Sequence, residues 1–543
     1  MSGVCFLGLD FSTQQLKALL IDDHLKVVYE DAVKFDTELP EYGTNGGVHL
    51  NVEAKTATSP TLMWVKALDL LLNRLKKSSI DVSKIAAISG SGQQHGSVYW
   101  KHGSEERLKT LDSSKSLHDN LSVPETCFRI DNSPIWMDSS TTEQCKRLEK
   151  AAGPPGMLPM YTGSSAYERF TGNQIAKIND NTPEAITETE RISLVSSFAA
   201  SLFLGKYAPI DFSDGSGMNL FDIILKEWWD ICLDTSAPNL KPKLGEPVPS
   251  GTVVGKISKY FVEAFGFSPN CEIVAFTGDN PSSLAGMRLK PSEVIVSLGT
   301  SDTVFLWVKN HKWAFEGHVF VNPINEKEYM ALLCYKNGSL QRERIRDACA
   351  GGSWEEFESL LQSTKMGNEG NIGIYFDVTE ITPLNSHGRY RFNAKDEPVD
   401  SFDNATEVRA LIEGQFLAKR LHAEQKNFQL SPQSRILATG GASESKAILQ
   451  VIADVFNRSV YVLDVPNSAS LGAAYRARHV SKEPSVSFDE STRNAPEFKL
   501  VASPTDGAAA VYDAMLERYK KLEAEHVKVD NFEQEVQGGS DSD

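Results

Sequence analysis

Two polar clusters near the middle of the chain contain residues whose types and spacing could do chemistry. One is 277–280 (TGDN) and the other is 297–301 (SLGTS), and each directly follows a short apolar run. Short apolar runs that end in glycine and small hydroxyl residues are typical of buried strands that lead into loops. Ligands of open α/β sheets bind beyond the carboxyl ends of the strands. The two clusters therefore predict an isolated carboxylate, Asp279, and a small-residue loop at strand ends.

A third polar cluster, 10–13 (DFST), follows the apolar run at the N-terminus. The segments 4–9, 17–22 and 26–30 predict an antiparallel meander with tight turns. In such a hairpin Ser12 and Thr13 can offer donors to a phosphate while Asp10 holds hydrated Mg²⁺. The same residue types are common in ordinary turns, so the tetrapeptide alone leaves both interpretations open.

Three further segments could contact a small polar ligand. The predicted strand 85–89 runs into GSGQQHG, where Gln94 and His95 could bind a polyol or form a tight turn with a satisfied histidine. Arg169 lies among aromatic residues, which fits either a surface stacking residue or a ligand contact. The segment PIWMDSS brings Trp136 and Asp138 together.

The predicted strand 435–439 ends in Gly440 and Gly441, and a helix follows. Glycines let a backbone approach a ligand closely, and a helix N-terminus favours a phosphate. The alternative is an ordinary helix start in which Ser443 is the N-cap.

The elements that must position these residues can be read from periodicity. Apolar spacing predicts a helix over 51–77, a buried helix over 194–204 and a C-terminal helix over 505–526. The order of strand, small-residue loop and strand in 293–308 echoes that in 5–21, which is a faint internal repeat. It predicts two related domains that each contribute one hydroxyl-bearing hairpin.

Bulk properties exclude several classes of protein. The chain has 543 residues, and 55 Lys and Arg against 72 Asp and Glu give a net charge of −17. This charge disfavours nonspecific binding to nucleic acid or to anionic membranes. The seven cysteines are widely spaced and form no CxxC pair, which indicates reduced thiols of a cytosolic protein. The N-terminus has no basic segment of the kind that begins a signal peptide.

Taken together and in order, these motifs resemble the FGGY family of carbohydrate kinases over about residues 4–480. The resemblance lies in DFSTQQLKA, SGSGQQHGSVYW, AYERFTGNQIAKI, SDGSGMNL, FTGDNPSSLAGM, SLGTSDT and ILATGGAS. It implies an α/β fold of two actin-like (RNase H-like) domains with a central active-site cleft. The implied division is a sugar-binding domain over 1–285, a nucleotide-binding domain over 286–480, and a C-terminal helix and acidic tail over 481–543.

Within that family the segments are most similar to the animal form of the branch that phosphorylates D-xylulose. The resemblance therefore implies transfer of phosphate from ATP, with Mg²⁺, to the C5 hydroxyl of D-xylulose, which yields D-xylulose 5-phosphate and ADP. The implied partners are the sugar and ATP, without nucleic acid or membrane. The protein is expected in the cytosol as a monomer or a homodimer.

The resemblance also assigns roles to individual residues. Asp279 is expected to be the general base, and Asp10 is expected to position the metal ion. The expected sugar-binding residues are Gln94, His95, Asp138, Arg169, Asp279 and Asn280. The expected ATP- and phosphate-binding residues are Asp10, Ser12, Thr13, Gly299, Thr300, Ser301, Trp354, Gly440, Gly441 and Ser445.

Two positions depart from the family's pattern, and rival functions stay open. Many members have W-x-D-x-R, but Ser140 stands here in place of the arginine, and Ser445 stands where asparagine is frequent.

One rival function is a nucleotide-binding sugar sensor without turnover, and another is a kinase for a different ketose or polyol. A third rival is an actin- or chaperone-type ATPase. Such chaperones append a peptide-binding domain, and no such domain is apparent in this sequence. A sensor can lose the base, so the presence of Asp279 favours the enzyme.

Overall fold

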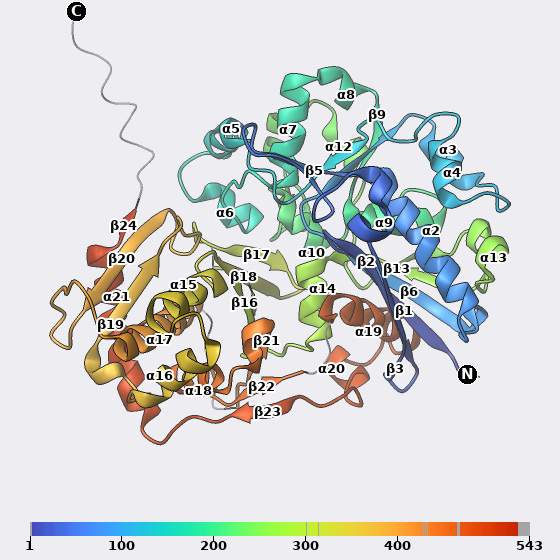
Figure 1. Ribbon diagram of the computed structural model, residues 1–543. Coiled ribbons are helices and arrows are strands. Elements are labelled where there is room, and N and C mark those ends of the chain that lie inside the picture. Colours follow the sequence, from blue (N-terminus) through green and yellow to red (C-terminus); the bar gives the residue numbers. More distant parts are fainter. Residues whose placement is uncertain are drawn as a thin grey trace, which may run out of the picture. The chain divides into compact units, whose positions relative to one another are not determined.

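The computed structural model describes residues 3–299, 301–312, 314–426, 428, 430, 431, 433–463 and 467–529. The chain forms two compact units, each of which combines helices with a sheet (Figure 1). The first unit comprises Met1–Lys290, Lys309–Met330 and Val465–Pro496, and the second comprises Pro291–Val308, Ala331–Asp464 and Glu497–Asp543. The predicted α/β class is thus confirmed. The acidic end of the predicted tail, 538–543, lies outside the described residues.

The sheet of the first unit has the strand order β12-β13-β6-β1-β2-β3, and β14 also pairs with β6. Strands β1, β2 and β3 are antiparallel neighbours, which confirms the predicted meander. Strand β6 is parallel to β1, to β13 and to β14. The strands are β1 (Cys5–Phe11), β2 (Gln15–Asp22), β3 (Val27–Lys34), β6 (Ile85–Gly92), β12 (Val253–Lys256), β13 (Glu272–Val274) and β14 (Thr277–Gly278).

Helices cover both faces of this sheet, and side chains alternate between the faces along β1. Leu7 and Leu9 belong to the apolar core that also contains Trp64 and Phe198. Gly8 points the other way, where a Cβ atom would lie 1.9 Å from the Ser470 carbonyl oxygen. The larger helices of the unit are α2 (Thr61–Lys77), α5 (Thr142–Ala152), α7 (Thr171–Asn181), α9 (Val195–Leu204), α14 (Asp279–Gly286) and α19 (Ser468–Lys482).

The second unit repeats the hairpin arrangement of the first. Its sheet contains the order β18-β16-β15-β21-β22-β23. Strand β15 pairs antiparallel with β16 and parallel with β21, as β1 does with β2 and β6. This likeness confirms the internal repeat. The strands are β15 (Val294–Leu298), β16 (Asp302–Val308), β18 (Tyr329–Tyr335), β21 (Ile436–Thr439), β22 (Val460–Val462) and β23 (Lys499–Ala502), and the larger helices are α15 (Ser339–Cys349), α16 (Trp354–Ser363), α17 (Asn404–Gln425), α18 (Lys446–Phe456) and α21 (Ala508–His526).

Two helix predictions need comment. The predicted helix over 51–77 is wrong in its first part, because strands β4 (His49–Asn51) and β5 (Thr56–Pro60) precede α2. Proline cannot donate to a helix ladder and keeps its predecessor extended, so Pro60 marks the start of the helix. The predicted helix over 194–204 is confirmed as α9, whose residues are all buried. In the described part of the chain no helix combines the length and apolarity that crossing a bilayer requires.

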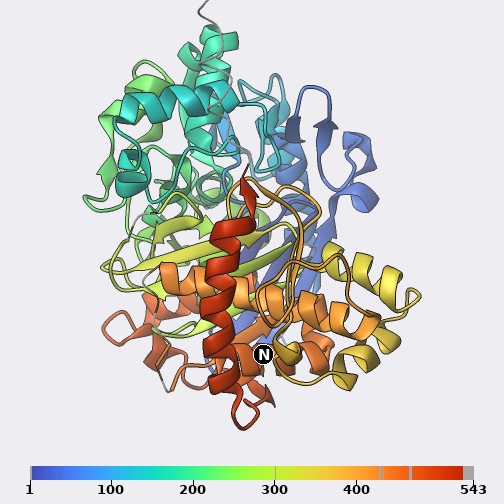
Figure 2. The ribbon, with the colours of Figure 1, turned by 90° about the vertical axis from the view of Figure 1, so that its left-hand side faces the viewer.

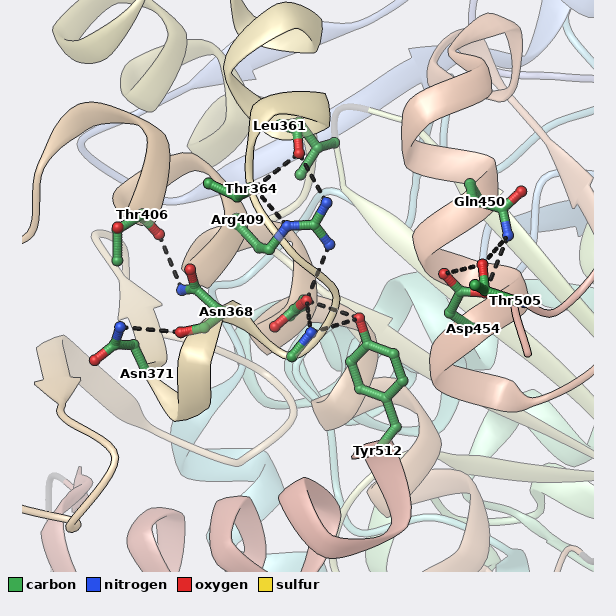
Figure 3. Close-up of polar contacts among 12 residues, drawn as sticks. Leu361, Thr364, Asn368, Asn371, Thr406, Arg409, Gln450, Asp454, Thr505 and Tyr512 are labelled. Carbon is green, nitrogen blue, oxygen red and sulfur yellow. Dashed lines mark hydrogen bonds and ion pairs between the residues drawn. The ribbon is translucent and has the colours of Figure 1, made fainter. Parts of the chain in front are cut away.

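The C-terminal helix α21 is integrated into the second unit, where it runs along α17 and α18 (Figure 2). The buried carboxylate of Glu413 on α17 holds it there. The Tyr512 hydroxyl donates to Glu413 Oε1 at 2.7 Å, and Arg409 donates to the same oxygen at 3.0 Å (Figure 3). The backbone N–H of Gly367 is a third donor, also at 3.0 Å. A buried carboxylate that binds three donors ties α21 to α17.

Removal of the Tyr512 hydroxyl tests this connection. Tyr512→Phe should lower the free energy of unfolding by about 1.5–3 kcal/mol, because the bond lost is to a buried charged group. Tyr390→Phe is the control, since the hydroxyl of the partly exposed Tyr390 donates to the backbone carbonyl of His387. That control should cost about 1 kcal/mol in urea denaturation. Equal losses in the two variants would contradict the special role of Glu413.

Candidate active site

The register of three strands brings Asp10 toward Asp279. Strand β6 lies between β1 and β14, so Asp10 aligns with Ser91, and Ser91 aligns with Thr277. Neighbouring strands lie about 4.8 Å apart, which places the β1 and β14 backbones roughly 10 Å apart. Asp279 is the first residue of α14, and α14 packs against α19, the helix that covers the Gly8 side of β1 (Figure 1). Asp10 is on that same side by strand alternation, so both carboxylates approach one region.

Asp10 is almost completely buried among oxygen and nitrogen donors. Its carboxylate accepts hydrogen bonds from the hydroxyls of Ser12 and Ser91, the latter at 2.8 Å. Lys17 Nζ lies 3.8 Å from Asp10 Oδ2. The described residues contain no group of three or more His, Cys, Asp or Glu side chains that could hold a metal by themselves. Mg²⁺ commonly binds to one or two carboxylates together with substrate phosphates, and the hard oxygen of Asp10 fits that pattern.

Asp279 has the electrostatics of a base. Burial and the negative charge of Asp10 raise the pKa of Asp279 to about 7. Hydrogen bonds act in the opposite direction, because the backbone N–H of Asn280 donates to Asp279 Oδ1 at 2.9 Å and that of Gln94 also donates. A carboxyl group whose pKa lies near neutrality can accept a proton and release it again under the same conditions.

The GQQHG segment follows β6 and faces the same region. Asn280 Nδ2 donates to Gln94 Oε1 at 2.8 Å, which joins the segment to the residue after Asp279. His95 Nδ1 lies 2.8 Å from the Gly217 carbonyl oxygen. A carbonyl can only accept, so Nδ1 carries the proton and Nε2 is an acceptor. Burial and the positive charge of Arg169 lower the pKa of His95 to about 3, which keeps the ring neutral.

Arg169 combines a stacking contact with a polar one. Its guanidinium lies 5.2 Å from the centre of the Tyr167 ring. It also donates to His318 Nε2 at 2.8 Å. The stacking interpretation is thus confirmed, while a contact with a ligand stays a prediction. His318 lies on β17 (His318–Val321), far away in sequence, and no motif there indicated its part in the site.

The Asp138 carboxylate is occupied by protein donors. It accepts from the Ser140 hydroxyl at 2.6 Å, from Gln174 Nε2 at 2.8 Å and from Lys177 Nζ at 3.1 Å. Burial acts to raise the pKa of Asp138, but Ser140 and Lys177 outweigh it and hold the pKa below its usual range. These contacts position the loop, and a direct contact of Asp138 with a sugar stays a prediction. Lys177 supplies a cation beside Ser140, the position where the family pattern has arginine.

Lys177 was missed by sequence reasoning, although it lies within the quoted AYERFTGNQIAKI segment. Its spacing of three residues from Gln174 on a helix puts both side chains on one face, which is the signal that could have found it. The 134–140 loop, which carries Asp138, reaches the DFST hairpin. Trp136 Nε1 donates to Thr13 Oγ1 at 2.9 Å, and Thr13 donates to Gln93 Oε1 at 3.3 Å.

A buried pair of carboxyl groups, Asp211 and Asp214, was also missed. Asp214 Oδ2 accepts from the Ser196 hydroxyl at 2.5 Å. Its other oxygen lies against the backbone of Gly278, where a Cβ atom would come within 2.7 Å. Burial and the charge of Asp211 raise the pKa of Asp214 well above its usual value. This shift of the pKa favours the protonated form of Asp214, which limits the negative charge beside Asp279.

Apart from Asp10, Ser12 and Thr13, the predicted phosphate- and nucleotide-binding residues lie in the second unit. Gly299 and Ser301 belong to the loop between β15 and β16, and Thr300 lies outside the described residues. Trp354 is the first residue of α16, and its ring is 41% exposed. The guanidinium of Arg346 lies 4.7 Å from the centre of that ring. One face of Trp354 is thus covered by a cation.

The glycine pair after β21 divides into two different positions. Gly440 has a φ of 87°, and a Cβ atom there would lie 2.5 Å from the Leu298 carbonyl oxygen, so glycine is needed for packing. Nothing lies within 4 Å of a Cβ atom at Gly441, so its backbone is accessible. The N-cap of α18 is Ser445, which accepts from the N–H of Ile448, whereas Ser443 had been the suggested cap. Ser445 keeps its hydroxyl hydrogen for another acceptor.

Comparisons with known proteins agree with this geometry. Residues 125–286 match the N-terminal domain, and residues 294–480 the C-terminal domain, of the FGGY family of carbohydrate kinases. The xylulose kinase of Rattus norvegicus is 57% identical over 520 residues, which cover 96% of this chain and 96% of the rat protein.

Solved structures show the same fold. The structure of xylulose kinase from Rhodospirillum rubrum superposes with a TM-score of 0.79 at 16% identity and covers 96% of this chain and 98% of that one. The structure of gluconate kinase from Lactobacillus acidophilus does so with a TM-score of 0.78 at 19% identity and the same coverage. Likeness at this identity is evidence of fold alone, and it confirms the predicted two-domain, actin-like α/β class.

The pKa of Asp279 can be measured directly. In protein labelled with ¹³C at aspartate carboxyl carbons, one resonance should titrate with a midpoint near 7. That resonance should be missing from Asp279→Asn, and the resonances of exposed aspartates should be unchanged in both proteins. A midpoint below 5 for the Asp279 signal would show that burial and Asp10 do not raise this pKa.

Proposed function

The chain belongs to the FGGY family of carbohydrate kinases, and we propose that it transfers the γ-phosphoryl group of ATP to the C5 hydroxyl of D-xylulose. The observation that carries the substrate assignment is the 57% identity to rat xylulose kinase over 96% of both chains. The fold by itself does not select the sugar, because a gluconate kinase shares it.

The sugar is proposed to bind in the first unit, on Gln94, His95, Arg169, Asp279 and Asn280. The neutral His95 ring supports this proposal, because its Nε2 lone pair can accept a hydrogen bond from a sugar hydroxyl. The amide of Asn280 and the guanidinium of Arg169 are donors for sugar oxygens. Asp138 then acts mainly by holding the 134–140 loop, on which Trp136 bonds to Thr13.

The proposed chemistry needs one proton acceptor and a well-aligned phosphate. The C5 hydroxyl oxygen forms a bond to the γ-phosphorus, the bond from that phosphorus to the β–γ bridging oxygen breaks, and the hydroxyl proton moves to Asp279. A base is most effective when its pKa lies near the working pH, and the pKa of Asp279 is about 7. Protein groups contribute mainly alignment and charge neutralisation in such a transfer.

The nucleotide is proposed to bind on the second unit. The 299–301 loop and the accessible backbone of Gly441 suit phosphate oxygens, and the exposed face of Trp354 suits an adenine ring. The hydroxyls of Ser12 and Thr13 are further donors. Asp10 would hold Mg²⁺, whose charge neutralises phosphate oxygens when it is bound.

Three broader assignments belong to the same proposal. The functional division is a sugar-binding domain over 1–285, a nucleotide-binding domain over 286–480 and a C-terminal segment over 481–543. The protein is proposed to act in the cytosol, which fits seven widely spaced cysteines that form no CxxC pair. It is proposed to act as a monomer or a homodimer.

A coupled assay of ADP release tests the proposed function. With ATP and Mg²⁺, D-xylulose should be turned over with a higher kcat/KM than ribulose, glycerol or gluconate. Asp279→Ala should lose at least about 100-fold in kcat because the proton acceptor is gone, while sugar binding is partly kept. Turnover of another polyol but not of D-xylulose would contradict the substrate. Binding of both ligands without any turnover would instead support the sensor.

A further inference from the structure

A buried cluster of three charges in the second unit has no part in the proposed mechanism. Asp302 is the first residue of β16 and directly follows the 299–301 loop. Arg342 donates to both carboxylate oxygens of Asp302, at 2.8 and 2.9 Å. Lys419 Nζ lies 3.0 Å from Asp302 Oδ2. All three side chains are buried, with at most 1% exposed.

Burying these charges is costly, and the cluster contains two cations but only one carboxylate. Burial lowers the pKa of Lys419, while Arg342 and Lys419 together hold the pKa of Asp302 below its usual range despite its burial. The next carboxylate that attracts Lys419 is that of Glu380, which also accepts from the backbone N–H of Asn337. Well-packed apolar residues often give as much stability as a buried ion pair, so stability alone does not explain the cluster.

The cluster is connected to both ends of the 299–301 loop. At one end, the backbone N–H of Ser339 donates to the Gly299 carbonyl at 3.1 Å. At the other end, Gly338 packs so closely on Asp302 that a Cβ atom would lie 2.6 Å from its backbone nitrogen. Gly338 is the N-cap of α15 and Ser339 is its first residue, and the first turn of this helix carries Arg342. The loop and the start of α15 are therefore joined at two points.

Helix α17 provides the other side of this frame. Gln415 Oε1 accepts from Arg342 at 3.0 Å, and Gln415 Nε2 donates to the Asn337 carbonyl at 2.7 Å. Lys419 lies one turn further along the same helix, with Nζ 4.6 Å from the centre of the Tyr335 ring. The same helix is held to α21 through Glu413 and Tyr512 (Figure 3). Asp302 is thus fixed by side chains from two helices that are themselves anchored.

We propose that Arg342 and Lys419 are positioning residues for nucleotide phosphates, because they fix Asp302 and thereby hold Gly299 and Ser301, two of the proposed phosphate-binding residues, in place. This inference rests on the phosphate-binding role of those residues in the proposed function. Residues that are held in place before the ligand arrives lose less entropy on binding. Neither residue has to touch the nucleotide.

Lys419→Met tests the inference with the least disturbance. It leaves a neutral pair of Asp302 and Arg342 and replaces the ammonium with an apolar group of similar length. Titration calorimetry of the full chain with ADP should show about tenfold weaker binding, since a misplaced site loses preorganisation. The KM for ATP should rise in step, while the KM for D-xylulose stays within about twofold.

Arg435→Met is the matched control. It removes the ion pair of Arg435 and Glu293, in which Nε and Oε1 are 2.6 Å apart. These residues directly precede β21 and β15, so the pair lies at the end of β15 opposite to the 299–301 loop. Its melting temperature should fall while ADP binding stays unchanged. If Lys419→Met fails to fold, Gln415→Ala removes the link between Arg342 and Asn337 without changing the charge, and it should also weaken ADP binding selectively.

Two results would overturn the inference. The first is an affinity of Lys419→Met for ADP that equals the affinity of the unmodified protein. If Lys419→Met does not fold, the same result in Gln415→Ala would overturn the inference. The other is equal weakening in Arg435→Met, which would mean that the cluster only stabilises the unit. Failure of the proposed function looks different: the unmodified protein would bind ADP normally but would not phosphorylate D-xylulose.

Discussion

The central constraint on this protein is that two carboxylates, Asp10 and Asp279, approach one another in a largely buried region. The register of β1, β6 and β14 enforces the approach, and the packing of α14 against α19 maintains it. Burial, and after it the negative charge of Asp10, disfavour the ionised form of Asp279 and raise its pKa to about 7. The neighbouring groups limit the charge in this region. The pKa of Asp214 is raised well above its usual value, the pKa of His95 is lowered to about 3, and the hydroxyls of Ser12 and Ser91 donate to Asp10.

The two units use one hairpin topology in electrostatically different ways. In the first unit Asp10 precedes the turn, and its nearest cation, Lys17, lies 3.8 Å away. In the second unit Asp302 follows the turn, and two cations within 3.0 Å neutralise it. The first arrangement suits the metal-binding role proposed for Asp10, and the second makes Asp302 a structural anchor for the residues before it. A duplicated framework thus fits the proposed division into a sugar-binding half and a nucleotide-binding half.

The sequence could predict what depends on local pattern. Alternation and apolar runs located the hairpins around Asp10 and 297–301, and the internal repeat followed from them. Contacts between distant segments have no local signal, so the bond of Arg169 to His318 could not be predicted. Apolar spacing predicts a helix over 51–77 but does not mark where the helix begins, and in the structure it begins directly after Pro60. The burial of Asp214 could not be foreseen, since Asp, Ser and Gly favour loops, which usually lie at the surface.

The most direct test of the central claim is the dependence of kcat on pH for the unmodified protein with ATP and D-xylulose. If transfer requires ionised Asp279, kcat should rise about tenfold per pH unit below 7 and level off above it. The midpoint belongs to the enzyme–substrate complex and should stay within about one unit of 7. A kcat that is constant between pH 5 and 8 would contradict the account, because it would mean that no group with a raised pKa accepts the proton.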